Sequence, residues 1–155
     1  MDIQIRPYRS TDFETLVPMV LDMHRVNGIS HLMKEQFAKT VSEFESHPDK
    51  GEILVIANEN TNMGYAILVF FWSNDWTGNI VFLDELFVAS TYRDQGIGNM
   101  FLAYLKDRFS SNSTGIMLET TPEKERAANL YQRFGFVPAV NNFWQYMFRE
   151  IIYPE

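Results

Sequence analysis

Residues 86–99 decide the fold, and in single letters they are LFVASTYRDQGIGN. An apolar, strand-like run leads through a turn with Gly96 and Gly98 into a helical pattern. A helix N-terminus offers free backbone N–H groups and the positive end of the helix dipole, and glycine lets an anion approach the backbone closely. The stretch therefore predicts either a phosphate site or an ordinary strand-to-helix turn.

Two common nucleotide motifs do not fit this turn. Phe101 stands where the third glycine of a dinucleotide fingerprint would lie, and the Gly-Lys-Ser/Thr of a P-loop is missing. A dinucleotide-binding domain is therefore a weak alternative.

Upstream of the turn, local patterns predict one strand, two helices and an antiparallel meander. The strand covers residues 3–7, the helices cover 11–26 and 34–44, and the meander has strands at 53–57, 65–72 and 80–88. Thr11 and Glu14 have the spacing of a capping box that opens the first helix.

Downstream of the turn, a helix begins at Gly96 and a short strand covers 116–119. The next helix would have Thr121 as its N-cap and Pro122 at its first position, and Gly135 would end it. Residues 137–139 and 143–151 would add two closing strands.

Composition narrows the class of protein. A chain of 155 residues with 46% hydrophobic residues suits a single domain spanning 1–155. A net charge of −7 disfavours nucleic acid as a partner, and the longest apolar runs fall well short of the roughly 18 residues of a membrane helix. We therefore expect a soluble, cytoplasmic protein without a membrane partner, with the oligomeric state open between monomer and homodimer.

The chain offers few metal ligands. It has no cysteine, and its three histidines, His24, His31 and His47, are dispersed. We expect each histidine at the surface or at a helix end, and we expect no metal site.

Two motifs in order resemble signatures of the GNAT superfamily of N-acetyltransferases. Arg93-x-x-Gly96-x-Gly98 after an apolar strand resembles the family's pyrophosphate motif, Arg/Gln-x-x-Gly-x-Gly/Ala. Residues 127–136, AANLYQRFGF, resemble the second signature, Ala-x-x-Leu-Tyr-x-x-x-Gly-Phe. The resemblance implies an α/β (α+β) GNAT fold: a central mixed, largely antiparallel sheet of six to seven strands with a splayed parallel pair, flanked by about four helices.

The resemblance also implies the cosubstrate and the reaction. Acetyl-CoA would donate its acetyl group to an amine that attacks directly in a ternary complex, and Tyr131 would protonate the departing thiolate. The main chain of Leu86, Phe87 and Val88 would bind the pantetheine arm. The pyrophosphate would be held by the turn formed by Arg93, Asp94, Gln95, Gly96, Ile97, Gly98 and Asn99.

Two of these assignments have alternatives. Tyr131 also belongs to a helical apolar stripe with Leu130 and Phe134, which is the pattern of a core aromatic. Lys124 stands where the family usually has an asparagine that contacts the CoA arm. This lysine would either reach a CoA phosphate or simply be solvated in the first turn of its helix.

Asp84 and Glu85 are the candidate residues for contact with the amine that accepts the acetyl group. Alternation along a strand would send the two carboxylates to opposite faces, so one of them would line the acceptor cavity. The run 83–88 with Tyr92-Arg93 is similar to the corresponding strand of polyamine acetyltransferases, where acidic residues meet a cationic substrate. The carboxylate would act as a base or bind the ammonium, unless the two are only an acidic pair at a strand edge.

Three functions remain open at this point. The acidic balance and the Asp84-Glu85 pair favour an enzyme that acetylates a small-molecule primary amine. A protein or peptide N-acetyltransferase is the second, and it would need an open groove beside the site. A CoA-binding module without catalysis is the third; Tyr131 argues against it, while Lys124 leaves it open.

Overall fold

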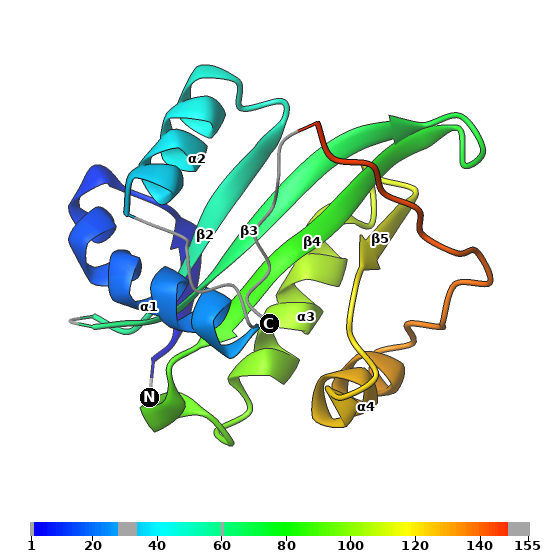
Figure 1. Cartoon of the computed structure of the whole chain (residues 1–155). Coiled ribbons are helices and arrows are strands. Elements are labelled where there is room, and N and C mark those ends of the chain that lie inside the picture. Colours follow the sequence, from blue (N-terminus) through cyan, green and yellow to red (C-terminus); the bar gives the residue numbers. More distant parts are fainter. Residues whose placement is uncertain (1, 28–33, 60, 149–155) are drawn as a thin grey trace.

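A five-stranded sheet in the order β1-β2-β3-β4-β5 forms the centre of the described chain (Figure 1). The structure is a computed structural model, and it describes residues 2–27, 34–59 and 61–148. The strands are β1 (Gln4–Pro7), β2 (Gly51–Ala57), β3 (Asn62–Ser73), β4 (Gly78–Val88) and β5 (Gly115–Leu118). The helices are α1 (Phe13–Val26), α2 (Lys34–Ser46), α3 (Ile97–Phe109) and α4 (Glu125–Arg133), with short 3-10 turns η1 (Ser10–Asp12) before α1 and η2 (Ser90–Tyr92) before α3.

The strand pairing confirms the meander and the parallel pair. The first four strands pair antiparallel with their neighbours in sequence. β4 and β5 run parallel, from Ile80 opposite Gly115 to Leu83 opposite Leu118. A parallel pair needs a crossover connection, and α3 supplies it. The α/β class with a mixed sheet is confirmed, although the described sheet has five strands and not six to seven.

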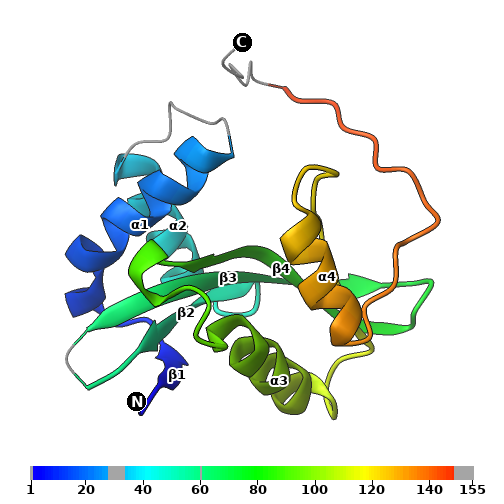
Figure 2. The same cartoon turned by 90° about the horizontal axis from the view of Figure 1, so that it is seen from below.

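Helices cover both faces of the sheet, α1 and α2 on one and α3 and α4 on the other (Figure 2). In β2, Ile53 packs on the α1 side and its neighbour Leu54 packs on the α3 side. Because successive side chains of a strand point to opposite faces, a strand covered on both faces has a continuous apolar run, as β2 has from Ile53 to Ala57. Within the described residues, the helices are all too short or too polar to cross a membrane.

The start of α1 differs from the predicted capping box of Thr11 and Glu14. The Asp12 carboxylate accepts the backbone N–H of Arg9 at 2.8 Å, and α1 begins directly after Asp12. The same carboxylate accepts two hydrogen bonds of 2.7 and 2.8 Å from the Arg6 guanidinium. The buried Asp12 therefore organises this turn, because a carboxylate that binds a guanidinium is a stronger acceptor than the hydroxyl of Thr11. The predicted end of the helix near residue 26 is confirmed.

The start of α4 also differs from the prediction. Lys124 is the N-cap in place of Thr121. The backbone N–H of Lys124 donates to the Thr121 carbonyl at 3.0 Å, so residues 121–124 close a separate turn and Pro122 lies in that turn. The helix consequently starts three residues after Pro122, at Glu125.

Gly135 ends α4 as predicted. It has a left-handed φ of 84°, and its N–H donates to the Gln132 carbonyl at 3.0 Å. The N–H of Phe136 donates to the Tyr131 carbonyl at 3.1 Å, and the two rings lie 5.8 Å apart edge to face. This is the hydrogen-bond pattern of a Schellman motif, with the apolar contact that accompanies it.

Residues 136–148 form no strand. The predicted strand at 137–139 and the described part of the predicted strand at 143–151 are therefore wrong, while residues 149–151 lie outside the described residues. Figure 2 shows this orange-to-red segment leaving the end of α4 and lying outside the sheet. Its aromatic side chains stay exposed, including Trp144 at 88% and Phe148 at 96%. Strand propensity depends on packing against a neighbouring strand, and this segment has none within the described chain.

Candidate active site

A β-bulge interrupts β4 near its carboxyl end. Opposite β3, Leu83 pairs with Leu68 and Glu85 pairs with Ile67, so Asp84 is an extra residue without a position of its own in the ladder. Such a residue bends the strand and increases its twist. Pairing between β4 and β5 also ends at Leu83. Beyond that point the β5 side of β4 has no strand partner among the described residues, and the parallel pair is open.

Glu85 lies on the α1 side of the sheet, and each of its carboxylate oxygens is hydrogen-bonded to a neighbouring side chain. Tyr65 of β3 donates its hydroxyl to Oε2 at 2.6 Å, and Nε2 of His24 in α1 lies 2.6 Å from Oε1. The side chain of Glu85 is 12% exposed and that of His24 is 17% exposed. The expectation of a surface or helix-end histidine therefore holds for the position of His24 in the last turn of α1 but fails for its surroundings.

The electrostatics of this cluster follow from its burial. The hydrogen bond to Glu85 raises the pKa of His24, and burial opposes that effect. Burial, followed by the charge of Glu85, raises the pKa of Tyr65. The phenol therefore keeps its proton and is the donor to Glu85. The sequence does not signal this cluster, because its members lie far apart along the chain and meet only when α1 packs on β3 and β4.

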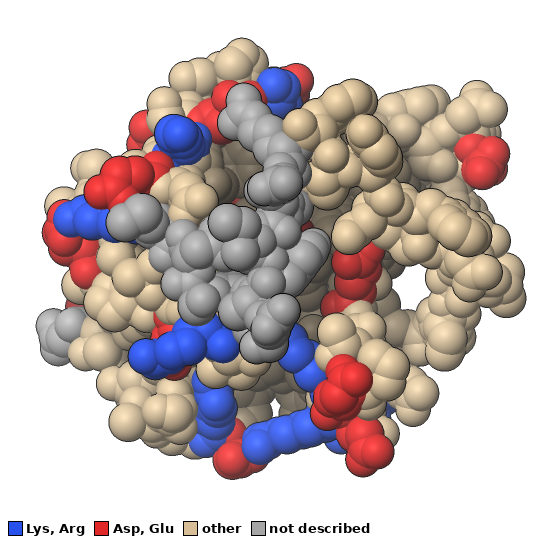
Figure 3. Space-filling view, viewed as in Figure 1, with Lys and Arg blue, Asp and Glu red and all other residues tan. Residues whose placement is uncertain are grey.

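Asp84 is exposed, in contrast to its neighbour Glu85. Although the residue is exposed, the protein around its carboxyl group displaces part of the water, and this desolvation raises the pKa of Asp84. The charges of Glu85 and Glu119 raise that pKa further, and His24 lowers it. Glu119 directly follows β5, so two carboxylates lie near each other at the open end of the parallel pair. On the face of the molecule seen in Figure 1, acidic side chains are visible in a hollow (Figure 3). A cationic group bound there would relieve the repulsion between them.

The turn before α3 has the geometry of an anion site. Asp94 and Gly96 adopt left-handed φ angles of 64° and 79°. A Cβ on Gly96 would meet no heavy atom within 4 Å, so open space borders the backbone there. The first N–H groups of α3, at Ile97 to Asn99, have no partners within the helix or elsewhere in the described part of the chain, so they can bind a ligand.

The side chains of the turn divide into exposed and buried ones. Asp94, Gln95 and Asn99 are exposed, whereas Ile97 is buried in the core and offers only its backbone. Lys and Arg side chains lie along the lower part of the same face as the hollow (Figure 3). A phosphate at this turn would therefore meet backbone amides and nearby cations.

Arg93 folds back on β4. Its Nε donates to the Val88 carbonyl at 2.8 Å, and its guanidinium lies 5.4 Å from the centre of the Phe87 ring. Leu86 and Val88 pack on the α3 side and Phe87 packs on the α1 side, so these residues can offer only main-chain groups to a ligand. A ligand that paired with the Val88 carbonyl would share it with Arg93.

Tyr131 lies half-buried on α4, against the core that α3 covers. Burial raises the pKa of its phenol, which therefore stays protonated at neutral pH. Its hydroxyl makes no hydrogen bond to any residue that the structure describes. The side chain is both part of the apolar stripe and a free proton donor, so the two readings of this tyrosine are compatible.

The start of α4 contacts the end of α1 and the turn before α3. Lys124 donates to the side-chain carbonyl of Asn27, and Arg126 forms an ion pair with Asp94. The Arg126 pair is largely exposed, and such pairs contribute little to stability. Arg126 was not among the predicted site residues, yet it stands beside the predicted pyrophosphate turn.

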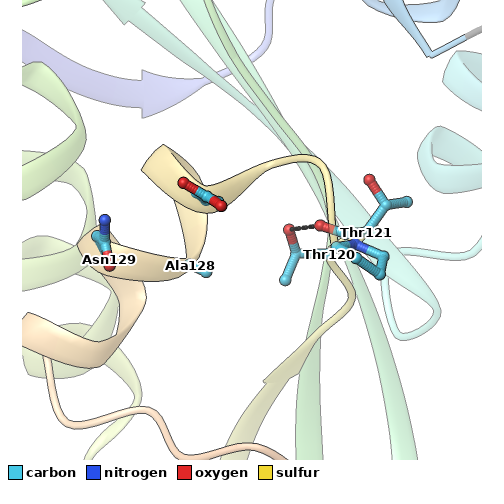
Figure 4. A pocket seen from close by; sticks show the side chains of 6 residues that line it. Thr120, Thr121, Ala128 and Asn129 are labelled. Carbon is cyan, nitrogen blue, oxygen red and sulfur yellow. Dashed lines mark hydrogen bonds between the residues drawn. The ribbon is translucent and has the colours of Figure 1, made fainter.

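A cavity of about 360 Å3 lies between α4 and the segment after β5 (Figure 4). It is lined by Thr120, Thr121, Pro122, Glu125, Ala128 and Asn129. Hydroxyl and amide groups beside apolar walls suit a ligand with alternating polar and apolar parts.

Gly98 fixes the distance between α3 and α4. A Cβ at this position would lie 3.0 Å from Cδ2 of Leu130, the residue before Tyr131. We expect Gly98→Val to lower the free energy of unfolding by about 1–3 kcal/mol, because extra methyl groups would push the two helices apart. Chemical denaturation measures this change. Adding Leu130→Ala should recover part of the loss; if the two changes prove additive, the Leu130 contact is not its cause.

Comparisons with known proteins agree with this geometry. Residues 17–136 match the Acetyltransferase (GNAT) family. The chain is 26% identical over 141 residues to thialysine N-epsilon-acetyltransferase of Mus musculus, covering 85% of this chain and 82% of that protein.

Solved structures share the fold. A possible acetyltransferase from Clostridium difficile 630 has a TM-score of 0.84 at 21% identity, covering 96% of this chain and 99% of that chain. Glucosamine-6-phosphate N-acetyltransferase from Arabidopsis thaliana has a TM-score of 0.71 at 16% identity, covering 94% and 99%. The family match spans well over half of the sequence and includes both glycine-bearing motifs, and the chain therefore belongs to the GNAT family of acetyltransferases.

Proposed function

We propose that this chain transfers the acetyl group of acetyl-CoA to a primary amine of a small cationic molecule. The observation that carries the proposal is the exposed Asp84 at the bulge, where the parallel pair opens and where Glu119 adds a second negative charge. The mouse relative is named for an amine substrate, thialysine, which supports an amine acceptor. The net charge of −7 is consistent with a cationic one.

Acetyl-CoA fits the residues present. The N–H groups at the start of α3 would hold the pyrophosphate, with Arg126, which pairs with Asp94, beside the turn. Main-chain groups of β4 beyond Leu83 would bind the pantetheine arm, because they lack a strand partner on the β5 side of the described chain.

The chemical step requires three contributions from the protein. The amine must reach the thioester as a neutral nucleophile, so its ammonium proton must pass to Asp84 or to a water beside it. An N–H donor of β4 would stabilise the oxyanion of the tetrahedral intermediate. When the C–S bond breaks, Tyr131 would give its proton to the leaving thiolate, and the proton that the attacking nitrogen loses would restore the phenol. The Tyr131 hydroxyl suits that role, because it is protonated and has no hydrogen bond to a described residue.

Acetyl-CoA is expected to raise the melting temperature, whereas NAD and ATP are not, because a ligand that binds only the folded state stabilises it. Thermal denaturation with each ligand at equal concentration measures this. Release of free CoA thiol in the presence of an amine panel then tests catalysis. Equal stabilisation by NAD would contradict the cosubstrate. Binding of acetyl-CoA without thiol release from any amine or peptide would favour the non-catalytic module.

A further inference from the structure

The two neighbouring acids of β4 have unequal surroundings. Both oxygens of Glu85 are hydrogen-bonded within the fold, at 2.6 Å to the Tyr65 hydroxyl and at 2.6 Å to Nε2 of His24. Asp84 is exposed and has no hydrogen bond to a described residue. Of the two, only Asp84 can turn toward a ligand without breaking buried hydrogen bonds.

The groups around His24 are few. From β4 it is faced by Glu85 and, at longer range, by Asp84; Tyr65 of β3 binds the same carboxylate but stays neutral. Nδ1 of His24 is buried and has no hydrogen-bond partner within the described part of the chain. Its Nε2 therefore makes the one contact described for the ring, and that contact fixes both the imidazole and the carboxylate.

We propose that His24 is a positioning residue of the acceptor site: it holds Glu85 turned inward and, when protonated, offsets the Glu85 charge, so that Asp84 alone presents a free carboxylate to the acceptor amine. This inference rests on the proposed function for the location of the acceptor. It assigns unequal roles to the two acids, with Asp84 meeting the substrate and Glu85 acting through His24 and Tyr65.

The proposal makes acceptor choice depend on pH. With His24 protonated, the three side chains Asp84, Glu85 and His24 carry a net charge of about −1, and with His24 neutral they carry about −2 by the ordinary charges of these groups. The raised pKa of His24 moves that change upward from its usual pH range. A doubly charged amine should therefore bind more tightly, relative to a singly charged one, as pH rises through the pKa of His24.

The test compares 1,5-diaminopentane with 1-aminopentane, which differ by one amino group. Calorimetric titration of the acetyl-CoA-free protein at pH 6 and pH 8.5 measures binding without requiring turnover. In the parent we expect the preference for the diamine to grow by roughly threefold to tenfold between the two pH values, the size of one partly screened charge.

His24→Gln should keep a donor to Glu85 while removing the charge. We expect this variant to prefer the diamine equally at both pH values. His47→Gln is the matched control, because His47 is an exposed histidine after α2 whose ring lies beside Glu43 and not beside the acids of β4. In this control, the preference for the diamine should change with pH as it does in the parent.

Histidine NMR tests the contact independently of any substrate. The chain has three histidines, and His24→Gln identifies the His24 signal by its loss. Glu85→Gln should lower the titration midpoint of His24, whereas Asp84→Asn should lower it much less.

The outcomes separate the inference from the proposed function. The positioning role would be overturned if the diamine preference of His24→Gln changed with pH as it does in the parent. It would also be overturned if Glu85→Gln left the titration midpoint of His24 unchanged. If neither amine binds the parent, the acceptor assignment fails and this inference fails with it, while stabilisation by acetyl-CoA would still stand.

Discussion

Tyr131→Phe is expected to lower kcat by about 10²- to 10⁴-fold, the usual contribution of a positioned general acid. The phenol proton would be needed only as the thiolate leaves, so acetyl-CoA affinity should stay close to that of the parent. The ring keeps its edge-to-face contact with Phe136, so the free energy of unfolding should hardly change. Single-turnover kinetics of acetyl transfer, with acetyl-CoA binding measured separately, separates these quantities.

Tyr104→Phe is the matched control for this experiment. Tyr104 lies on α3, and its hydroxyl accepts a hydrogen bond of 3.3 Å from Arg108, away from the turn and the bulge. Its loss should leave acetyl transfer unchanged. If Tyr131→Phe also transferred the acetyl group at the parental single-turnover rate, Tyr131 would be only a core aromatic.

Asp12→Asn is expected to lower the free energy of unfolding by about 3 kcal/mol, because it leaves the Arg6 guanidinium partly buried without its counter-charge. The side chains of Asp12 and Arg6 are only 6% and 21% exposed. The carboxylate also accepts the N–H of Arg9 and the amide of Asn62, at 2.8 and 3.1 Å. Urea denaturation at neutral pH measures the change.

Asp12 should also make the free energy of unfolding depend on pH in the acid range. The Arg6 guanidinium holds the pKa of Asp12 at about 2, below its ordinary 3.8. A lowered carboxyl pKa stabilises the folded state above the unfolded pKa, and that stabilisation is lost as pH falls from about 4 towards 2. The loss should amount to about 2 kcal/mol in the parent and be absent in Asp12→Asn.

Glu43→Gln is the control for both parts of this experiment, because it removes an exposed ion pair with Lys50. The denaturation midpoint should stay nearly constant in this variant. An acid limb that is the same in Asp12→Asn and in the parent would show that other carboxylates govern acid unfolding.

Features with local signals were predictable from the sequence. The glycine turn before α3, the stop at Gly135 and the strands of the meander depend on short-range preferences, and the structure has them where the patterns indicate. The N-terminus of α4 was mislocated because the Thr121 carbonyl is used in a turn that no propensity marks.

The surroundings of the candidate acids could not be predicted from local patterns. The bulge at Asp84 is defined only by the register with β3, and the contact between His24 and Glu85 joins residues 61 positions apart. Simple alternation predicts neither the bulge that removes Asp84 from the ladder nor which of Asp84 and Glu85 the fold encloses. The predicted closing strands are wrong for a related reason, since a strand needs an edge to pair with and residues 136–148 lie outside the sheet (Figure 2).

The bulge gives Asp84 an unusual freedom to vary. Leu83 and Leu86 pack in one core and Phe87 packs in the other, and this alternation is regular once residue 84 is left out of the count. Position 84 is thus an insertion in the strand, and neither core depends on its side chain. Natural variation or directed evolution can therefore exchange the side chain at the proposed acceptor position for an amide, a hydroxyl or a cation, while the scaffold and the turn before α3 stay as they are.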